Sequence, residues 1–173
     1  MRVGRLYIIS AMTVSLLAVA PANAQSPMME DAFSPAQGAT ALVIKTIGTA
    51  KKSIHVAAYS FTSRPIAAAL VAAHDKGVDV EVVLDKSQRR GRYTLVPYLR
   101  AHNIPTRINS RYAIMHDKTM IIDGVTLELG SFNYTKAAEE KNAENVLVIH
   151  GSKKIVMDYD KQWRMLWNGA EEK

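Results

Sequence analysis

The sequence contains no cysteine, and this absence removes several kinds of chemistry at once. Disulfide bonds, thiolate catalysis and metal sites with cysteine ligands are all excluded. Carboxylates do not gather into a dense cluster and there are only five histidines, so nothing in the chain resembles a two-metal catalytic centre. Linkers and low-complexity stretches are also missing, which predicts one domain with a core of ordinary size.

Long apolar runs are missing as well, except at the N-terminus. A basic start, MRVGR, precedes the apolar run LYIISAMTVSLLAVA, and Ala22-Asn23-Ala24 then matches a signal-peptide cleavage site. We therefore expect residues 1–24 to be a signal peptide and residues 25–173 to be a single mature domain that is periplasmic or secreted. A retained membrane anchor is the alternative, and the short run disfavours it. No stable membrane association is expected after cleavage.

The formal net charge is +6, and loss of Arg2 and Arg5 with the signal peptide leaves +4, from 20 basic and 16 acidic residues. This excess of positive charge mildly favours polyanions as binding partners. Its densest part is KSQRRGRY, residues 86–93, which places Tyr93 beside four cations, Lys86, Arg89, Arg90 and Arg92. Such a cluster can hold phosphates of a nucleic acid backbone without reading its bases. A solvated loop is the alternative, and charge alone does not decide between them.

The pattern of the first half of the domain predicts a βαβ unit. Residues 54–61 and 78–85 are short runs rich in β-branched residues, bounded by turn residues, and both are interpreted as buried strands. The alanine-rich segment between them is expected to be a helix that Ser63 caps and Gly77 ends. A strand, a helix and a strand at this spacing imply a parallel pair.

The remaining segments complete a mixed sheet with helices on both faces, an α/β fold. Ser34 is a candidate N-cap for a first helix, with Pro35 at its first position. The other expected elements are a short helix over 94–103, an extended segment over 104–108, strands over 113–123 and 126–133 joined across Asp123-Gly124, a short helix or loop over 135–144, a strand over 145–149 and a final amphipathic helix capped by Ser152.

Two basic side chains project together from the predicted strand 114–122. Because side chains alternate between faces, His116 and Lys118 share one face, roughly 7 Å apart at the backbone. A lysine neutralises the charge of phosphoryl oxygens, while a neighbouring imidazole attacks phosphorus or moves a proton. Taken alone, however, His-x-Lys in a strand is more often an ordinary edge face.

The chain carries a second His-x-Lys, which serves as an internal control. His74 and Lys76 fall at the end of the alanine-rich helix, where residues i and i+2 point about 200° apart. Glu81 stands where the first copy has Asp123, but no Gly-Ser-x-Asn follows at the right distance. We interpret this copy as a surface coincidence.

The copy at His116 stands in a longer pattern. Asp123 follows Lys118 after four residues, and Gly130-Ser131-x-Asn133 follows after six more. This pattern resembles the HKD signature of the phospholipase D superfamily, in its compact, exported Nuc-type branch of nonspecific bacterial endonucleases. The resemblance extends over AAYSFTSRPIAAALVAAHDKGVDVEVVLD and NAENVLVI, and it implies the α-β-α sandwich of that family with one motif per chain.

The resemblance also implies a role for each site residue. His116 would be the nucleophile that forms a phosphohistidine. Lys118 and Asn133 would bind the non-bridging phosphate oxygens, assisted by Ser131, whose hydroxyl is an uncharged donor. Glu144 would accept a hydrogen bond from the histidine ring and hold its tautomer, and Asp123 would hold the hairpin. For Glu144, a solvated residue is the alternative.

Large members of the superfamily use two motifs, one histidine as nucleophile and one as general acid. This chain has one motif, so the resemblance implies a homodimer whose active site lies on a two-fold axis. No metal and no other cofactor is expected, because lysine and asparagine side chains supply the charge stabilisation.

The expected function is therefore that of a metal-independent phosphodiesterase, a nonspecific endonuclease on DNA, with RNA left open. The alternative is a phospholipase D-type lipid phosphodiesterase or phosphatidyl transferase, although the sequence shows no amphipathic helix with a basic face that would seek a membrane. A noncatalytic DNA-binding module is a third class, which the intact motif disfavours.

Overall fold

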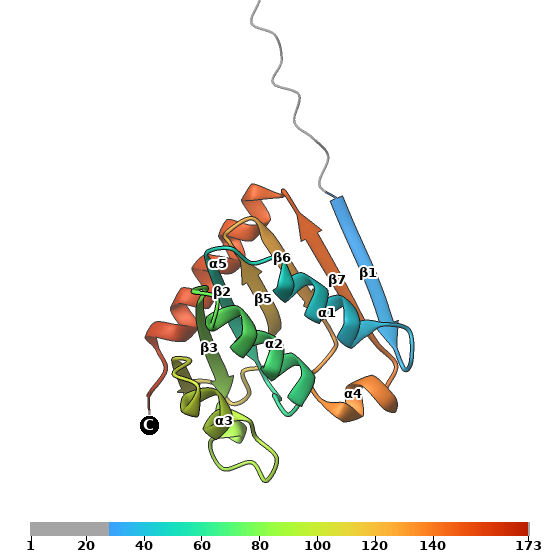
Figure 1. Cartoon of the computed structure of the whole chain (residues 1–173). Helices are drawn as coiled ribbons and strands as arrows, with labels where there is room; N and C mark the ends of the chain where they lie inside the picture. The colour runs from blue at the N-terminus through green and yellow to red at the C-terminus, as the bar shows by residue number, and fades with distance from the viewer. Residues whose placement is uncertain (1–27, 173) are drawn as a thin grey trace, which may run out of the picture.

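The computed structural model describes residues 28–172, so the predicted signal peptide and its cleavage site lie outside the described residues. A seven-stranded sheet runs through the molecule in the order β1-β7-β6-β5-β2-β3-β4 (Figure 1). The strands are β1 (Met28–Ser34), β2 (Ser53–Ala58), β3 (Asp79–Asp85), β4 (Thr106–Asn109), β5 (Lys118–Ile122), β6 (Thr126–Gly130) and β7 (Glu144–His150).

The sheet is mixed, as predicted. Strands β2, β3 and β4 are parallel to one another, and the remaining neighbours are antiparallel. Helix α2 (Arg64–His74) joins β2 to β3, which confirms the βαβ unit. β2 and β5 pair antiparallel at the centre, so the end of β2 lies beside the start of β5.

Helices cover both faces of the sheet (Figure 1). One core contains α1 (Ala39–Gly48), α2 and α3 (Val96–Ala101) together with Val56, Val82 and Met120 of the sheet. The other lies under α5 (Lys153–Asn168), where Trp163 and Leu166 contact Ala57, Val83 and Ile121. Side chains of adjacent residues in a strand thus pack into opposite cores, because they alternate between the two faces of the sheet. Among residues 28–172, no helix has the length and apolar character of a membrane span.

The predicted N-cap at Ser34 is wrong. Residues 28–34 form β1, and Ser34 pairs with Glu144 of β7 in the antiparallel ladder. Its hydroxyl donates to the Asn142 carbonyl oxygen at 3.0 Å, so it serves a strand end rather than a helix. Helix α1 begins only at Ala39, after Gly38 in the left-handed conformation at φ 88°.

The hairpin across Asp123-Gly124 is confirmed, but its first strand is shorter than predicted. Both turn residues have positive φ, 54° and 66°. β5 begins at Lys118, because the preceding residues bond elsewhere: the Met115 amide donates to the Asp85 carboxylate at 2.8 Å. The predicted strands over 54–61 and 126–133 likewise end early, at Ala58 and Gly130.

The chain beyond each of these strand ends forms the loops of the site. The isolated bridge between Phe61 and Tyr134 brings the loop after β2 against the loop after β6. Tyr134 continues into the short helix α4 (Lys136–Glu140), which Thr135 caps through its side chain. Ser63 and Ser152 precede α2 and α5 as predicted, but neither hydroxyl makes a capping hydrogen bond.

Candidate active site

The strand directions bring the motif residues to one edge of the sheet. The register pairs Ala58 with Lys118, Thr119 with Leu129 and Gly130 with Val146. The end of β2, the start of β5, the end of β6 and the start of β7 are therefore neighbours. His116 precedes β5, Asn133 follows β6, and Glu144 opens β7, so residues distant in sequence meet at this edge.

His116 and Lys118 both lie against the ring of Tyr59, the first residue after β2. The His116 ring is exposed, and its centroid lies 4.7 Å from that of Tyr59, at a tilt of 55°. The Lys118 Nζ lies 5.4 Å from the same ring centroid and donates to the His116 carbonyl oxygen at 2.8 Å. The aromatic ring thus holds the two basic groups together on one side of the strand.

Lys118 is 5% exposed and forms no salt bridge within residues 28–172, which is unusual for a lysine. Burial lowers the pKa of its ammonium, while the carboxylates of Asp117 and Glu144 act in the opposite direction. A buried cation of this kind, next to an exposed histidine, suits an anionic substrate that brings its own negative charge.

The end of β6 passes very close to β7. A Cβ added to Gly130 would lie 2.2 Å from the Asn145 carbonyl oxygen, so only glycine fits without a backbone shift. Just beyond, Ser131 and Asn145 exchange hydrogen bonds. The Ser131 amide donates to the Asn145 side-chain oxygen at 3.2 Å, and the Asn145 amide donates to the Ser131 hydroxyl oxygen at 3.1 Å. The serine hydroxyl is thereby fixed near the strand end.

Glu144 lies on the same edge, partly buried, as the first residue of β7. Its carboxylate accepts a hydrogen bond from the Asn142 side chain at 3.0 Å, and within the described residues it has no hydrogen bond with His116. Its charge acts on the Lys118 ammonium instead. The histidine partnership that the resemblance implies remains a prediction.

Asp123 is at the opposite end of β5 from His116. Its carboxylate accepts hydrogen bonds from three consecutive amides, those of Lys51, Lys52 and Ser53 at 2.9, 2.7 and 3.0 Å. Burial raises the pKa of the carboxyl, but these amide bonds outweigh it and leave the pKa below its ordinary value. The residue ties the hairpin to the start of β2 and does not face the other motif residues.

The basic cluster surrounds the 3₁₀ turn η1 (Lys86–Arg89) at the end of β3, on the same edge of the sheet. Two of its members have intramolecular partners: Lys86 donates to the Tyr112 carbonyl oxygen at 3.1 Å, and Arg89 forms a 2.8 Å ion pair with Glu171. Arg90 and Arg92 are exposed and form no salt bridge within residues 28–172, and Arg92 lies 5.4 Å from the Tyr93 ring centroid.

The second His-x-Lys is remote from this edge. His74 is the last residue of α2, and Lys76 is exposed in the turn that leads to β3. Helix α2 runs back along the sheet, so its C-terminus lies beside the starts of β2 and β3, at the edge where Asp123 lies.

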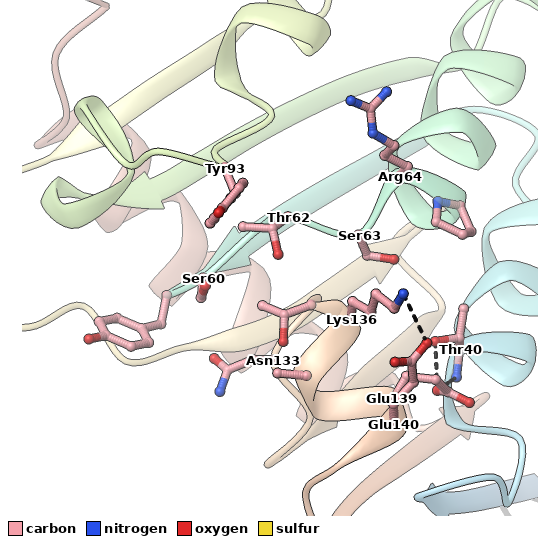
Figure 2. Close-up of a pocket in the computed structure, with 14 residues that line it drawn as sticks. Thr40, Ser60, Thr62, Ser63, Arg64, Tyr93, Asn133, Lys136, Glu139 and Glu140 are labelled. Carbon is pink, nitrogen blue, oxygen red and sulfur yellow. Dashed lines mark hydrogen bonds and ion pairs between the residues drawn. The ribbon is translucent and has the colours of Figure 1, made fainter.

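A cavity of about 900 Å³ opens beside the site, and Tyr59 and Asn133 belong to its lining (Figure 2). The Asn133 side-chain oxygen is buried without a hydrogen bond partner among the described residues. Tyr59, Asn145 and this cavity are the parts of the site that the sequence did not reveal. Within residues 28–172, no three histidine or acidic side chains converge as metal ligands do.

Comparisons with known proteins agree with this geometry. The family model described as cardiolipin synthase, PLD-like domain, matches residues 43–167. A phospholipase D of Rickettsia bellii is 36% identical over 131 residues, 76% of this chain and 65% of that protein. A mitochondrial cardiolipin hydrolase of Chlamydomonas reinhardtii is 31% identical over 70% of this chain and 54% of its own length. The chain thus spans less than two thirds of these relatives.

Among solved structures, Nuc, a phospholipase D family member from Salmonella typhimurium, is 42% identical. The match has a TM-score of 0.81 and covers 84% of this chain and 97% of that one. NucT from Helicobacter pylori, at 22% identity and a TM-score of 0.73, covers 83% of this chain and 98% of its own and supports the fold alone. The fold, the site edge and these matches agree, and the chain belongs to the phospholipase D-like family.

Proposed function

We propose that the protein is a phosphodiesterase that hydrolyses nucleic acid backbones without a metal ion. The observation that carries this proposal is the placement of an exposed His116 imidazole and a buried Lys118 ammonium against one tyrosine ring. Asn133 follows the neighbouring strand at the same edge. A nucleophile, a fixed positive charge and amide donors are what phosphoryl transfer requires of a protein.

The proposed reaction has two steps. A His116 ring nitrogen attacks phosphorus, a nitrogen–phosphorus bond forms, and the bond from phosphorus to the leaving oxygen breaks. The leaving oxygen takes a proton from a general acid. Water then attacks the phosphohistidine, the nitrogen–phosphorus bond breaks, and the water proton returns to the acid. Lys118, Asn133 and Ser131 bind the non-bridging oxygens during both steps.

A second histidine, to serve as the general acid, does not lie at this edge within residues 28–172. His116 is the one histidine in residues 28–172 that lies at this edge beside Lys118. We propose that His116 of a second copy serves as the acid, in a homodimer whose two-fold axis passes beside the site. A two-fold interface brings the same surface of both subunits together, so one motif per chain becomes two per site.

Nucleic acid is the proposed substrate because exposed Arg90 and Arg92 lie on a loop at the same edge, and because the chain is 42% identical to Nuc. A lipid phosphodiester is the second candidate. The names of the sequence relatives favour it, since they are a phospholipase D and a cardiolipin hydrolase. We also propose export through the N-terminal signal peptide, on the basis of the sequence alone.

Plasmid degradation in excess EDTA tests the function. We expect the wild type to cut DNA under these conditions and the His116→Ala variant to lose more than about 1,000-fold of the rate, the scale of losing a catalytic nucleophile. The matched control is His74→Ala, which alters the other His-Asp-Lys and is expected to keep the wild-type rate.

Two outcomes would contradict the proposal. Full activity of His116→Ala in a clean preparation would exclude the nucleophile. Failure of the wild type to cut DNA, together with head-group release from phospholipid vesicles that His116→Ala abolishes, would make the lipid phosphodiester the substrate.

A further inference from the structure

The cavity beside the site is lined by loops and helix ends that carry no part of the motif except Asn133. It lies among the loop after β2, the start of α2, the start of α1 and the short helix α4 (Figure 2). Tyr59 and Asn133 belong both to its lining and to the site edge. Its volume of about 900 Å³ is within the range of cavities that hold small organic groups. A group attached to a phosphate at His116 would therefore enter it directly.

The charges on the lining do not suit a second phosphate. Arg64 and Lys136 are balanced by Glu139 and Glu140, so the formal charge of the lining is zero. Glu139 accepts from the amide and the hydroxyl of Thr40 at 2.9 and 2.7 Å, and Glu140 lies 3.5 Å from the Lys136 Nζ. The two cations and two carboxylates cancel, so the lining gives no net attraction to a second phosphate and suits an uncharged occupant.

Hydrogen-bonding groups nonetheless face the cavity without partners. The Asn133 side-chain oxygen is buried in this lining without a hydrogen bond partner among the described residues, and the Ser63 hydroxyl makes no capping hydrogen bond to α2. Figure 2 shows the Ser63 and Thr62 hydroxyls facing the space above α4. A buried polar group of this kind gains when a ligand supplies the missing partner. An occupant with several donors and acceptors fits this wall better than a hydrocarbon chain does.

An exposed aromatic ring stands at the rim. Tyr93 lines the cavity and is 70% exposed, and the Arg92 guanidinium lies 5.4 Å from its ring centroid. Exposed aromatic rings beside arginines are the surfaces on which unpaired bases stack. Flat, uncharged and rich in hydrogen-bonding groups, a nucleobase fits within the volume and suits the neutral lining, its polar groups and the Tyr93 ring.

We propose that this cavity receives an unpaired base of the nucleotide next to the scissile phosphate, so that the enzyme acts on single-stranded nucleic acid in preference to duplex. This inference rests on the proposed nucleic acid substrate and names the form of it that the site accepts. In a duplex, each base is paired and stacked, and it enters such a cavity only after it has been unpaired and unstacked, which costs free energy.

The test fills the cavity and compares substrates with and without a base. Ala137 is exposed on α4 and lines the cavity, so Ala137→Trp occupies the space without disturbing the core. Ala68→Trp is the matched control, because Ala68 is exposed on α2 outside the lining. Each variant is assayed in EDTA on a labelled single-stranded oligonucleotide, on its duplex and on bis(p-nitrophenyl) phosphate, a phosphodiester without a base.

We expect the wild type to have a kcat/KM on the single strand about tenfold or more above that on the duplex. Ala137→Trp should lower kcat/KM on the single strand at least tenfold further than on bis(p-nitrophenyl) phosphate, the scale of one stacked base. Ala68→Trp should leave unchanged the ratio of kcat/KM on the single strand to kcat/KM on bis(p-nitrophenyl) phosphate. Tyr93→Ala, at an exposed position that does not affect folding, should shift the ratio in the same direction as Ala137→Trp.

The outcomes separate this inference from the function on which it rests. Equal rates on single strand and duplex, or a ratio that neither Ala137→Trp nor Tyr93→Ala changes, would overturn the base cavity while leaving the nuclease intact. Hydrolysis of bis(p-nitrophenyl) phosphate without cleavage of any oligonucleotide would overturn both. If Ala137→Trp instead blocked lipid hydrolysis, the occupant would be part of a lipid and the inference would fail.

Discussion

At the residue scale, identical side chains acquire different chemistry from their neighbours. The tripeptide His-Asp-Lys occurs twice, at 74–76 and at 116–118. In the first copy the lysine is exposed in a turn, whereas in the second it is buried against an aromatic ring beside its histidine. The difference arises from Tyr59, which directly follows another strand, β2, and lies 57 residues earlier in the chain than His116.

Tyr59 is expected to position His116 and Lys118 through its ring, not through its hydroxyl. We predict that Tyr59→Phe keeps kcat near the wild-type value, whereas Tyr59→Ala lowers it about 3- to 30-fold, the scale of one cation–π contact. Steady-state kinetics on bis(p-nitrophenyl) phosphate measures this. A Tyr59→Phe variant as impaired as Tyr59→Ala would show that the hydroxyl, not the ring, matters.

At the element scale, the β5–β6 hairpin carries the site at one end and its anchor at the other. Asp123 holds the turn to the start of β2 through three amides, while Lys118 begins the strand at the site. Gly130 lets β6 approach β7 closely enough for Ser131 and Asn145 to bond. One hairpin thus fixes both halves of the motif.

The anchor should contribute to stability and not to chemistry. We predict that Asp123→Ala loses about 1–3 kcal/mol in the free energy of unfolding at pH 7, because three amides lose their acceptor. The folded pKa lies below the unfolded one, so this contribution is present above the unfolded pKa and is lost as the pH falls through the folded pKa. Urea denaturation from pH 7 to pH 3 should show the difference from wild type shrinking below about pH 4.

The specific activity of the folded Asp123→Ala variant provides the contrast. It should match the wild type, because the residue lies at the far end of β5 from His116. Loss of turnover in a fully folded sample would place Asp123 in the catalytic machinery after all.

A second polar pair lies inside the core beneath the site loops. Glu128 of β6 is 1% exposed, and its carboxyl accepts a hydrogen bond from the Tyr134 hydroxyl at 2.6 Å. Burial raises the pKa of Glu128 to about 8, although the tyrosine bond acts in the opposite direction. Tyr134 in turn accepts from the Thr62 and Ser63 amides through its carbonyl oxygen, so the pair supports the loops that line the cavity.

This pair predicts a stability that falls with rising pH. The folded pKa of Glu128 is above the unfolded one, so its contribution is complete below the unfolded pKa and is lost as the pH rises through about 8. Between pH 5 and pH 8.5 the wild type should lose roughly 3–5 kcal/mol that Glu128→Gln does not lose. Urea denaturation across this range measures the difference, with exposed Glu140→Gln as the control. Parallel curves for wild type and Glu128→Gln would mean that Glu128 is already ionised in the native state at neutral pH.

At the scale of the whole molecule, the sheet separates two cores and leaves one edge for the site. Helices α1, α2 and α3 cover one face and α5 covers the other, so the loops at the edge are free to meet a substrate and a second subunit. The single motif then makes the oligomeric state part of the proposed mechanism. A shared site loses activity when either subunit loses its histidine.

Mixed dimers test the shared site. When wild type and His116→Ala are co-expressed in equal amounts, random pairing makes one quarter of the dimers wild type in both subunits. We therefore expect about one quarter of the activity of the same total amount of pure wild-type protein, because only these dimers have two histidines. Analytical ultracentrifugation should show a dimer for both proteins. A value near one half, or an active monomer, would show that each chain acts alone.

The sequence by itself determined the fold class, most of its elements and the identity of the motif. Periodicity and turn residues are local signals, so the βαβ unit, the hairpin across Asp123-Gly124 and the amphipathic α5 were predictable. The same signals failed at Ser34. A serine followed by a proline is common at the start of a helix, but Ser34 pairs with Glu144 in the sheet. A ladder contact between residues so far apart in the chain leaves no local trace in the sequence.

Only the tertiary structure decided which residues surround the motif. Strand register places Tyr59 against His116 and Lys118, separates Asp123 from them by the length of β5, and brings Asn145 against Gly130. The cavity likewise arises where helix ends and loops from four parts of the chain converge. The motif is readable because its chemistry needs particular residues at fixed spacing along one hairpin. Its surroundings are not, because they depend on long-range pairing that no stretch of the sequence encodes alone.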